Sequence, residues 1–123
     1  MARKVLVIED HAPTLELMKV VLQAGGYEVT AALDGQLGLQ KAAAELPDLV
    51  LLDVMMPELN GFEVCRRLKA DPRTKPIPVI MVSVKASPEN FLLGEQAGAC
   101  GYVTKPFENQ KLLDKMSKTL ERS

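Results

Sequence analysis

Acidic side chains follow two apolar runs of the sequence, at the point where each run ends. Glu9 and Asp10 come directly after Val5–Ile8, and Asp53 comes directly after Leu49–Leu52. Short continuous apolar runs of this kind are typical of strands buried on both faces of a parallel sheet. In open α/β sheets, ligands bind at the carboxyl ends of the strands. Three carboxylates at such ends could hold a divalent cation, and a carboxylate beside a cation can attack phosphorus. We therefore interpret Asp53 as the working residue.

Two further polar residues fit the same chemistry. Ser83 follows a third apolar run and can donate a hydroxyl hydrogen bond, while Lys105 offers a point charge to a phosphoryl oxygen. Met55 stands two residues after Asp53 and cannot transfer a proton. An aspartyl phosphate formed here should therefore persist instead of turning over rapidly, and we expect a signalling protein and not an enzyme.

Strands and helices are predicted to alternate along the whole chain. Apolar runs predict the strands, while helical spacing of apolar residues, the caps Asp34, Asn60 and Ser87, and glycine stops predict the helices. The expected strands are 5–8, 27–31, 49–52, 79–82 and 101–103, and the expected helices are 13–24, about 35–45, 60–70, 88–97 and about 107–120. Such alternation implies a parallel sheet covered by helices on both faces.

The fold class that this alternation indicates is a doubly wound α/β sheet of five strands, a flavodoxin-like (βα)5 sandwich. The strand order 2-1-3-4-5 comes from the fold class and cannot be read from periodicity. In that order the topological switch point falls between the first and third strands, so Asp10 and Asp53 are delivered to one crevice.

Length and composition limit the class of protein. The 123 residues suit a single domain spanning 1–123, and the net charge of -1 gives no electrostatic basis for binding nucleic acid. Cys65 and Cys100 form no metal-ligand motif and are predicted to be reduced, mostly buried thiols. Neither a signal peptide nor a membrane span is predicted, which favours a cytoplasmic location.

The chain resembles the receiver domain of two-component response regulators over its whole length. The matching segments are Val5-Leu6-Val7-Ile8-Glu9-Asp10, Leu51-Leu52-Asp53-Val54-Met55-Met56-Pro57, Gly61 and Thr104-Lys105-Pro106-Phe107. The resemblance implies that Asp53 is the phosphoacceptor. It also implies that Glu9, Asp10, Asp53 and the backbone carbonyl of Met55 hold Mg²⁺ or Mn²⁺.

The resemblance further implies how the signal is passed on. Ser83 and Lys105 would contact the phosphoryl oxygens, and Tyr102 would turn inward when Ser83 moves toward the phosphate. The face made by the fourth helix, the fifth strand and the fifth helix would then be remodelled for an output protein. The phosphodonor implied is a sensor histidine kinase or a histidine phosphotransfer protein.

Other interpretations stay open. We interpret the chain as a stand-alone receiver, and the alternative is an excised module of a larger DNA-binding or enzymatic regulator; the length of the reading frame would decide between them. A small Mg²⁺-dependent phosphatase is opposed by Met55, and a receiver that works without phosphorylation is opposed by the complete set of acids. Tyr102 could equally be a simple core or edge aromatic.

Three positions near the expected site need separate comment. Ser83 replaces the threonine found in many receivers, and Val84 fills a slot usually held by a small residue, where its branched side chain could crowd the phosphoryl entrance. His11 is interpreted as a surface loop residue, because nothing else around it suggests a set of metal ligands or a general base. Glu9 and Asp10 are not interpreted as a helix cap, because Pro13 at the first helical position would put the cap near Ala12.

Overall fold

Five parallel strands form the centre of the molecule. The computed structural model describes residues 2–121. Its strands are β1 (Lys4–Ile8), β2 (Glu28–Ala32), β3 (Leu49–Asp53), β4 (Val79–Ser83) and β5 (Gly101–Thr104). They lie in the order β2-β1-β3-β4-β5, which confirms the predicted topology and places β1 beside β3.

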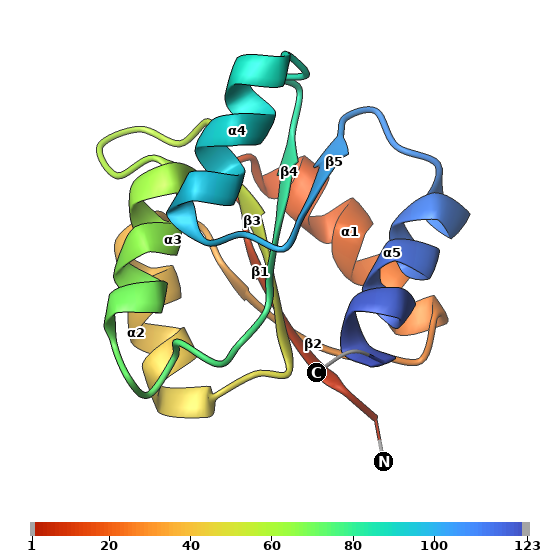
Figure 1. Ribbon diagram of the computed structural model, residues 1–123. Helices are drawn as coiled ribbons and strands as arrows, with labels where there is room; N and C mark the ends of the chain where they lie inside the picture. Colours follow the sequence, from red (N-terminus) through yellow and green to blue (C-terminus); the bar gives the residue numbers. More distant parts are fainter. Residues whose placement is uncertain (1, 122–123) are drawn as a thin grey trace.

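Helices alternate with the strands and cover both faces of the sheet (Figure 1). They are α1 (Ala12–Ala24), α2 (Gly35–Glu45), α3 (Gly61–Ala70), α4 (Pro88–Ala97) and α5 (Asn109–Glu121). Side chains of His11, Asp34, Asn60 and Ser87 accept the hydrogen bonds that cap the first four helices. Each cap satisfies a backbone N–H that the first helical turn leaves unpaired.

Two apolar layers hold the helices against the sheet. Alternate side chains of the central strands point to opposite faces, so Leu6 and Leu52 pack toward α2, α3 and α4, whereas Val7 and Leu51 pack toward α1 and α5. Every residue of β3 is buried. Because β3 is buried on both faces, its last residue has a fixed position, which is what a reactive side chain there requires.

The sequence misplaced several boundaries by one or two residues. β4 extends to Ser83, one residue beyond the predicted strand, and α5 begins at Asn109 instead of Phe107. The start of β4 at Val79 is as predicted, because Pro78 has no N–H for the ladder. The cap of α1 is His11, one residue before the predicted position.

The prediction that both thiols are mostly buried was right for Cys65 and wrong for Cys100. Cys65 is buried on α3, but Cys100 is exposed in the loop between α4 and the edge strand β5. A loop that leads into an edge strand has no element covering its outer side, which explains the exposure. Among the described residues, no helix has the length and apolar character needed to cross a membrane.

Candidate functional site

Three carboxylates meet at the carboxyl edge of the sheet. β1 and β3 are neighbours in register, with Ile8 opposite Leu52, so the residues that follow these two positions emerge side by side. Glu9, Asp10 and Asp53 each offer one carboxylate oxygen, and these oxygens lie within 4.8 Å of one another. The cluster was predicted from the ends of the two apolar runs, and the topology explains why residues so far apart in sequence meet.

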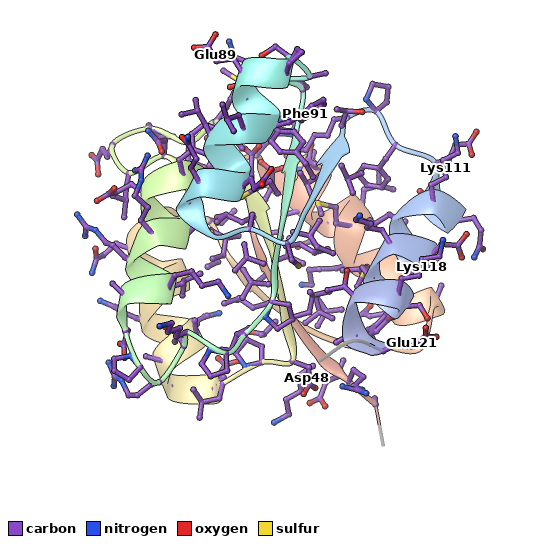
Figure 2. All side chains as sticks on the ribbon, viewed as in Figure 1. Asp48, Glu89, Phe91, Lys111, Lys118 and Glu121 are labelled. Carbon is purple, nitrogen blue, oxygen red and sulfur yellow. The ribbon has the colours of Figure 1, made fainter. Side chains whose placement is uncertain are left out.

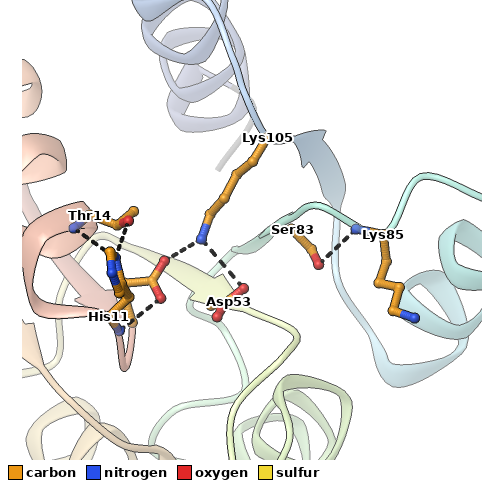
Figure 3. Close-up of polar contacts among 7 residues, drawn as sticks. His11, Thr14, Asp53, Ser83, Lys85 and Lys105 are labelled. Atoms are coloured by element: carbon orange, nitrogen blue, oxygen red, sulfur yellow. Dashed lines mark hydrogen bonds and ion pairs between the residues drawn. The ribbon is translucent and has the colours of Figure 1, made fainter.

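Burial divides the three acids into two kinds. Glu9 and Asp53 are only 2% and 7% exposed, whereas Asp10 is exposed at the mouth of the site. Lys105, which follows β5, reaches across the sheet edge to both buried acids. Its Nζ pairs with Glu9 and lies 3.6 Å from Oδ1 of Asp53 (Figure 3). One ammonium group thus faces two buried carboxylates, which leaves the cluster with an excess of negative charge.

The electrostatics of the site make Asp53 hold its proton more tightly than a free aspartate. Its pKa rises from the ordinary value of 3.8 to about 7, chiefly because of burial and then because of the neighbouring charge of Glu9. Lys105 opposes this rise, and so does the backbone of Met55. A divalent cation among the acids would favour the ionised form of Asp53, so the pKa and the affinity for a cation are coupled.

The start of α1 orients Glu9. The backbone N–H of His11 donates to Oε2 of Glu9 at 3.2 Å. The ring of His11 caps α1 by accepting from the backbone N–H of Thr14, and its Nδ1 lies 2.7 Å from Oγ1 of Thr14. The sequence placed His11 on the surface, which is correct, but missed its capping role. The only feature of the sequence that could have indicated this cap is the hydroxyl of Thr14 three residues later, because histidine is not among the preferred capping residues.

Ser83 lies at the carboxyl end of β4 and is fully buried. Its Oγ accepts a hydrogen bond from the backbone N–H of Lys85 at 3.2 Å, and its carbonyl accepts one from the N–H of Lys105 at 2.8 Å. These bonds tie the end of β4 to the residue that carries the site's ammonium group. In residues 2–121, no hydrogen bond joins Ser83 to the three carboxylates. Val84, the next residue, is 61% exposed.

Tyr102 on β5 links the sheet edge to α4. Its ring packs edge-on against Phe91 of α4, with centroids 4.7 Å apart and an interplanar angle of 74°. A Cβ on Gly94 would come within 3.3 Å of the ring, so this glycine makes room for it. Among the described residues, the buried hydroxyl makes no well-formed hydrogen bond, although it faces the side chain of Ser83. Burial raises the pKa of Tyr102, and Ser83 opposes this rise. The side chain therefore lies between the site and α4.

The loop after β3 keeps the backbone near Met55 in place. The N–H of Gly61 donates to the carbonyl of Val54 at 2.9 Å. A Cβ on Gly61 would lie 2.3 Å from the carbonyl oxygen of Asp53, so only glycine allows α3 to begin this close to the strand end. The side chain of Met55 is 48% exposed, and its thioether has no proton to donate to the site.

The donor set fits a hard divalent cation. Carboxylate and carbonyl oxygens are the ligands that Mg²⁺ prefers, and the set contains neither thiolate nor imidazole that would favour a softer metal. The raised pKa of Asp53 also fits a cation site, because Lys105 alone does not balance the negative charge of the three carboxylates.

The sequence matches the response regulator receiver domain family over residues 5–117. It is 41% identical over 112 residues to the response regulator PleD of Caulobacter vibrioides, a match that covers 91% of this chain and 25% of PleD. The chain spans about half the length of other curated relatives, among them the transcriptional regulator RpaA of Synechocystis, to which it is 37% identical over 98% of its own length.

Solved receiver structures share the fold. The chemotaxis protein CheY4 of Vibrio cholerae superposes with a TM-score of 0.91 at 33% identity, covering 96% of this chain and 98% of that one. The receiver domain of the sensor histidine kinase PA1611 from Pseudomonas aeruginosa, described with a magnesium ion in its active-site cleft, superposes with a TM-score of 0.91 at 25% identity, covering 98% and 99%. The chain belongs to the receiver domain family of response regulators, the phosphoacceptor modules of two-component signalling.

Proposed function

We propose that Asp53 accepts a phosphoryl group and that the aspartyl phosphate is the signalling form of this protein. The observation that carries the proposal is the cluster of Glu9, Asp10 and Asp53, with carboxylate oxygens within 4.8 Å and Lys105 beside them. Asp53 is the member at the end of a fully buried strand, so its oxygen is held still for attack.

The cofactor in this proposal is Mg²⁺, or Mn²⁺ in its place. Glu9, Asp10, Asp53 and the backbone carbonyl of Met55 would hold it, and the bound ion would neutralise phosphoryl charge. The magnesium ion described for the PA1611 receiver supports this choice. Exposed Asp10 is the acid that solvent and an incoming ion reach first.

The chemical roles divide among the remaining residues. A carboxylate oxygen of Asp53 attacks phosphorus while the bond from phosphorus to the donor nitrogen breaks. The ammonium of Lys105 takes up charge on a phosphoryl oxygen, and the hydroxyl of Ser83 donates to another. Met55 offers no proton for hydrolysis, so the product persists and the protein turns over slowly or not at all.

The partners follow from this chemistry. The phosphodonor is a phosphohistidine on a sensor histidine kinase or a histidine phosphotransfer protein, and the reaction takes place in the cytoplasm. The output partner binds the face of α4, β5 and α5, to which Tyr102 connects the site through Phe91. Charged side chains such as Lys111 and Lys118 project outward from α5, where a partner can reach them (Figure 2).

Incubation with acetyl phosphate and Mg²⁺, followed by intact-mass measurement, tests the proposal. Wild type should gain one phosphate, and Asp53→Asn should gain none. Asp114→Asn is the matched control, because Asp114 is an exposed aspartate on α5 that does not belong to the acid cluster. Equal phosphorylation of wild type and Asp53→Asn would overturn the assignment.

A further inference from the structure

The ring of Tyr102 fills the space between the sheet and α4. β5 is an edge strand beside β4, and Met81 of β4 lies opposite Tyr102. A Cβ on Gly94 would meet the tyrosine ring at 3.3 Å and Cγ of Met81 at 3.5 Å, so both side chains lie under the same turn of α4. The hydroxyl oxygen at the far end of the ring is buried. Tyr102 therefore has an inward orientation, with its polar end away from solvent.

This inward orientation is unfavourable for the hydroxyl itself. Among the described residues, the buried hydroxyl makes no well-formed hydrogen bond. A hydroxyl that leaves water without gaining a good partner destabilises the orientation that buries it. An outward orientation has space available, because a cavity of about 270 Å³ lies between α4 and the start of β5, lined in part by Gly94, Ala99 and Gly101. Another contact must therefore hold the ring inward.

Phe91 supplies that contact. Its ring meets the ring of Tyr102 edge-on, with centroids 4.7 Å apart and an interplanar angle of 74°, which is a favourable geometry for an aromatic pair. Phe91 lies one helical turn before Gly94, so the glycine makes room for the tyrosine ring and the phenylalanine packs against it. Figure 2 shows Phe91 on the side of α4 that faces β5. Its side chain is 40% exposed, so Phe91 forms the solvent side of the pair.

We propose that Phe91 is a positioning residue that holds Tyr102 in the inward orientation before any phosphoryl group is bound. The family resemblance implies that this tyrosine turns inward when the acceptor is phosphorylated, but in this protein the hydroxyl is already buried. Phosphorylation then changes the face of α4 and β5 without a turn of Tyr102. This last statement rests on the proposed function of Asp53, whereas the role of Phe91 does not.

Ionisation of the Tyr102 hydroxyl measures its orientation, because Phe91 touches the ring and not the hydroxyl. The chain has two tyrosines and no tryptophan, so a Tyr27→Phe parent leaves Tyr102 as the single chromophore that titrates. Burial raises the pKa of Tyr102 above its ordinary value of 10.0. Phe91→Leu keeps an apolar side chain but removes the ring, so the ionisation constant measured by absorbance should rise by about threefold.

Leu92→Ala is the control for this titration, because Leu92 is the next residue of α4 and is 53% exposed. Its ionisation constant should equal that of the parent. Phe91→Trp restores an aromatic ring and should also keep the parent value, while urea unfolding verifies that each variant is folded. An unchanged constant in Phe91→Leu would overturn the proposal, and so would an equal rise in Leu92→Ala or in Phe91→Trp.

Acrylamide quenching of the Tyr102 fluorescence at neutral pH tests the second statement. The parent should be quenched equally with and without acetyl phosphate and Mg²⁺. Phe91→Leu should be quenched about twofold more strongly than the parent before phosphorylation and return toward the parent afterwards. A clear fall in quenching of the parent on phosphorylation would show that the ring was not already inward. Intact mass separates the two proposals: without a phosphate adduct the proposed function fails, and the titration alone decides the role of Phe91.

Discussion

At the scale of single residues, Asp53 makes the stability of the protein depend on pH. Its folded-state pKa of about 7 lies above the ordinary value of 3.8, so the folded protein keeps a proton that the unfolded chain has lost. The stabilisation from this group is complete below about pH 4 and is lost as the pH rises through 7. Burial of Asp53 therefore lowers the stability of the folded protein most at the pH values at which its carboxylate is ionised.

Asp53→Asn should remove this dependence. Without metal, the free energy of unfolding of wild type should fall by about 2–4 kcal/mol between pH 4 and pH 8 relative to the variant. Urea unfolding of both proteins at several pH values in the presence of a chelator measures the difference. If the free energies of unfolding of wild type and variant changed with pH in the same way over this range, the pKa of Asp53 would not be raised.

Val84 is the residue whose size should control access to the site. It follows buried Ser83 and is 61% exposed. With Asp53 as the proposed phosphoacceptor, the branched side chain of Val84 would narrow the path of the phosphodonor to the site. Val84→Ala should speed phosphorylation by acetyl phosphate by about threefold, which corresponds to less than 1 kcal/mol in the barrier. Val20→Ala is the control, because Val20 is a similarly exposed valine on α1. Unchanged rates in both variants would show that Val84 does not obstruct the donor.

At the scale of elements, the close approach of α3 to the end of β3 depends on Gly61. A Cβ there would meet the carbonyl oxygen of Asp53 at 2.3 Å and Cα of Val54 at 2.7 Å, both of them backbone atoms that cannot move aside independently. Gly61→Ala should lower the free energy of unfolding by about 3 kcal/mol and slow phosphorylation of Asp53, because the loop that carries Met55 must shift.

Gly94→Ala provides the matched comparison for Gly61→Ala. Both glycines lie in helices and both gain helix propensity from alanine, by about 1 kcal/mol. At Gly94 the new Cβ would meet only the side chain of Tyr102, at 3.3 Å. We expect a change in unfolding free energy within about 1 kcal/mol for this variant. Chemical denaturation of the two proteins side by side distinguishes backbone crowding from a general effect of losing a glycine.

Element boundaries could be predicted where local chemistry decides them. Asp34, Asn60 and Ser87 were recognised as caps because their short polar side chains are common helix starters, and the structure confirms all three. His11 was missed because its capping depends on which ring nitrogen faces Thr14, and composition does not reveal this. Exposure of Cys100 was also missed, since it depends on β5 being an edge strand.

At the scale of the whole molecule, alternation of apolar runs with helical segments was enough to predict an α/β sheet, but not the order of its strands. The order followed from the fold class, and the structure confirms it. Predicting the acid cluster needed only that β1 and β3 be neighbours. Two features could not be predicted, because both depend on side-chain conformations across the sheet: the pairing of Lys105 with Glu9, and the buried hydroxyl of Tyr102.

Metal binding should stabilise the entire fold, because the acids that would hold it end the two central strands β1 and β3. At a Mg²⁺ concentration one hundred times the dissociation constant, the free energy of unfolding should rise by about 2.7 kcal/mol, and a chelator should reverse the rise. Because Asp53 must lose its proton to bind, the affinity should rise with pH up to about 7 and then level off.

Calorimetric titration with Mg²⁺ at pH 5.5, 6.5 and 8, in buffers of different ionisation enthalpy, measures both the affinity and the protons released. Wild type should bind about tenfold more tightly per pH unit below 7 and release close to one proton per ion there. Asp53→Asn should bind more weakly, with an affinity nearly independent of pH over the same range. If the affinity of wild type showed the same pH dependence as the variant, the proton on Asp53 would not be linked to the metal, and the coupling of charge, metal and reactive carboxylate proposed for this site would be wrong.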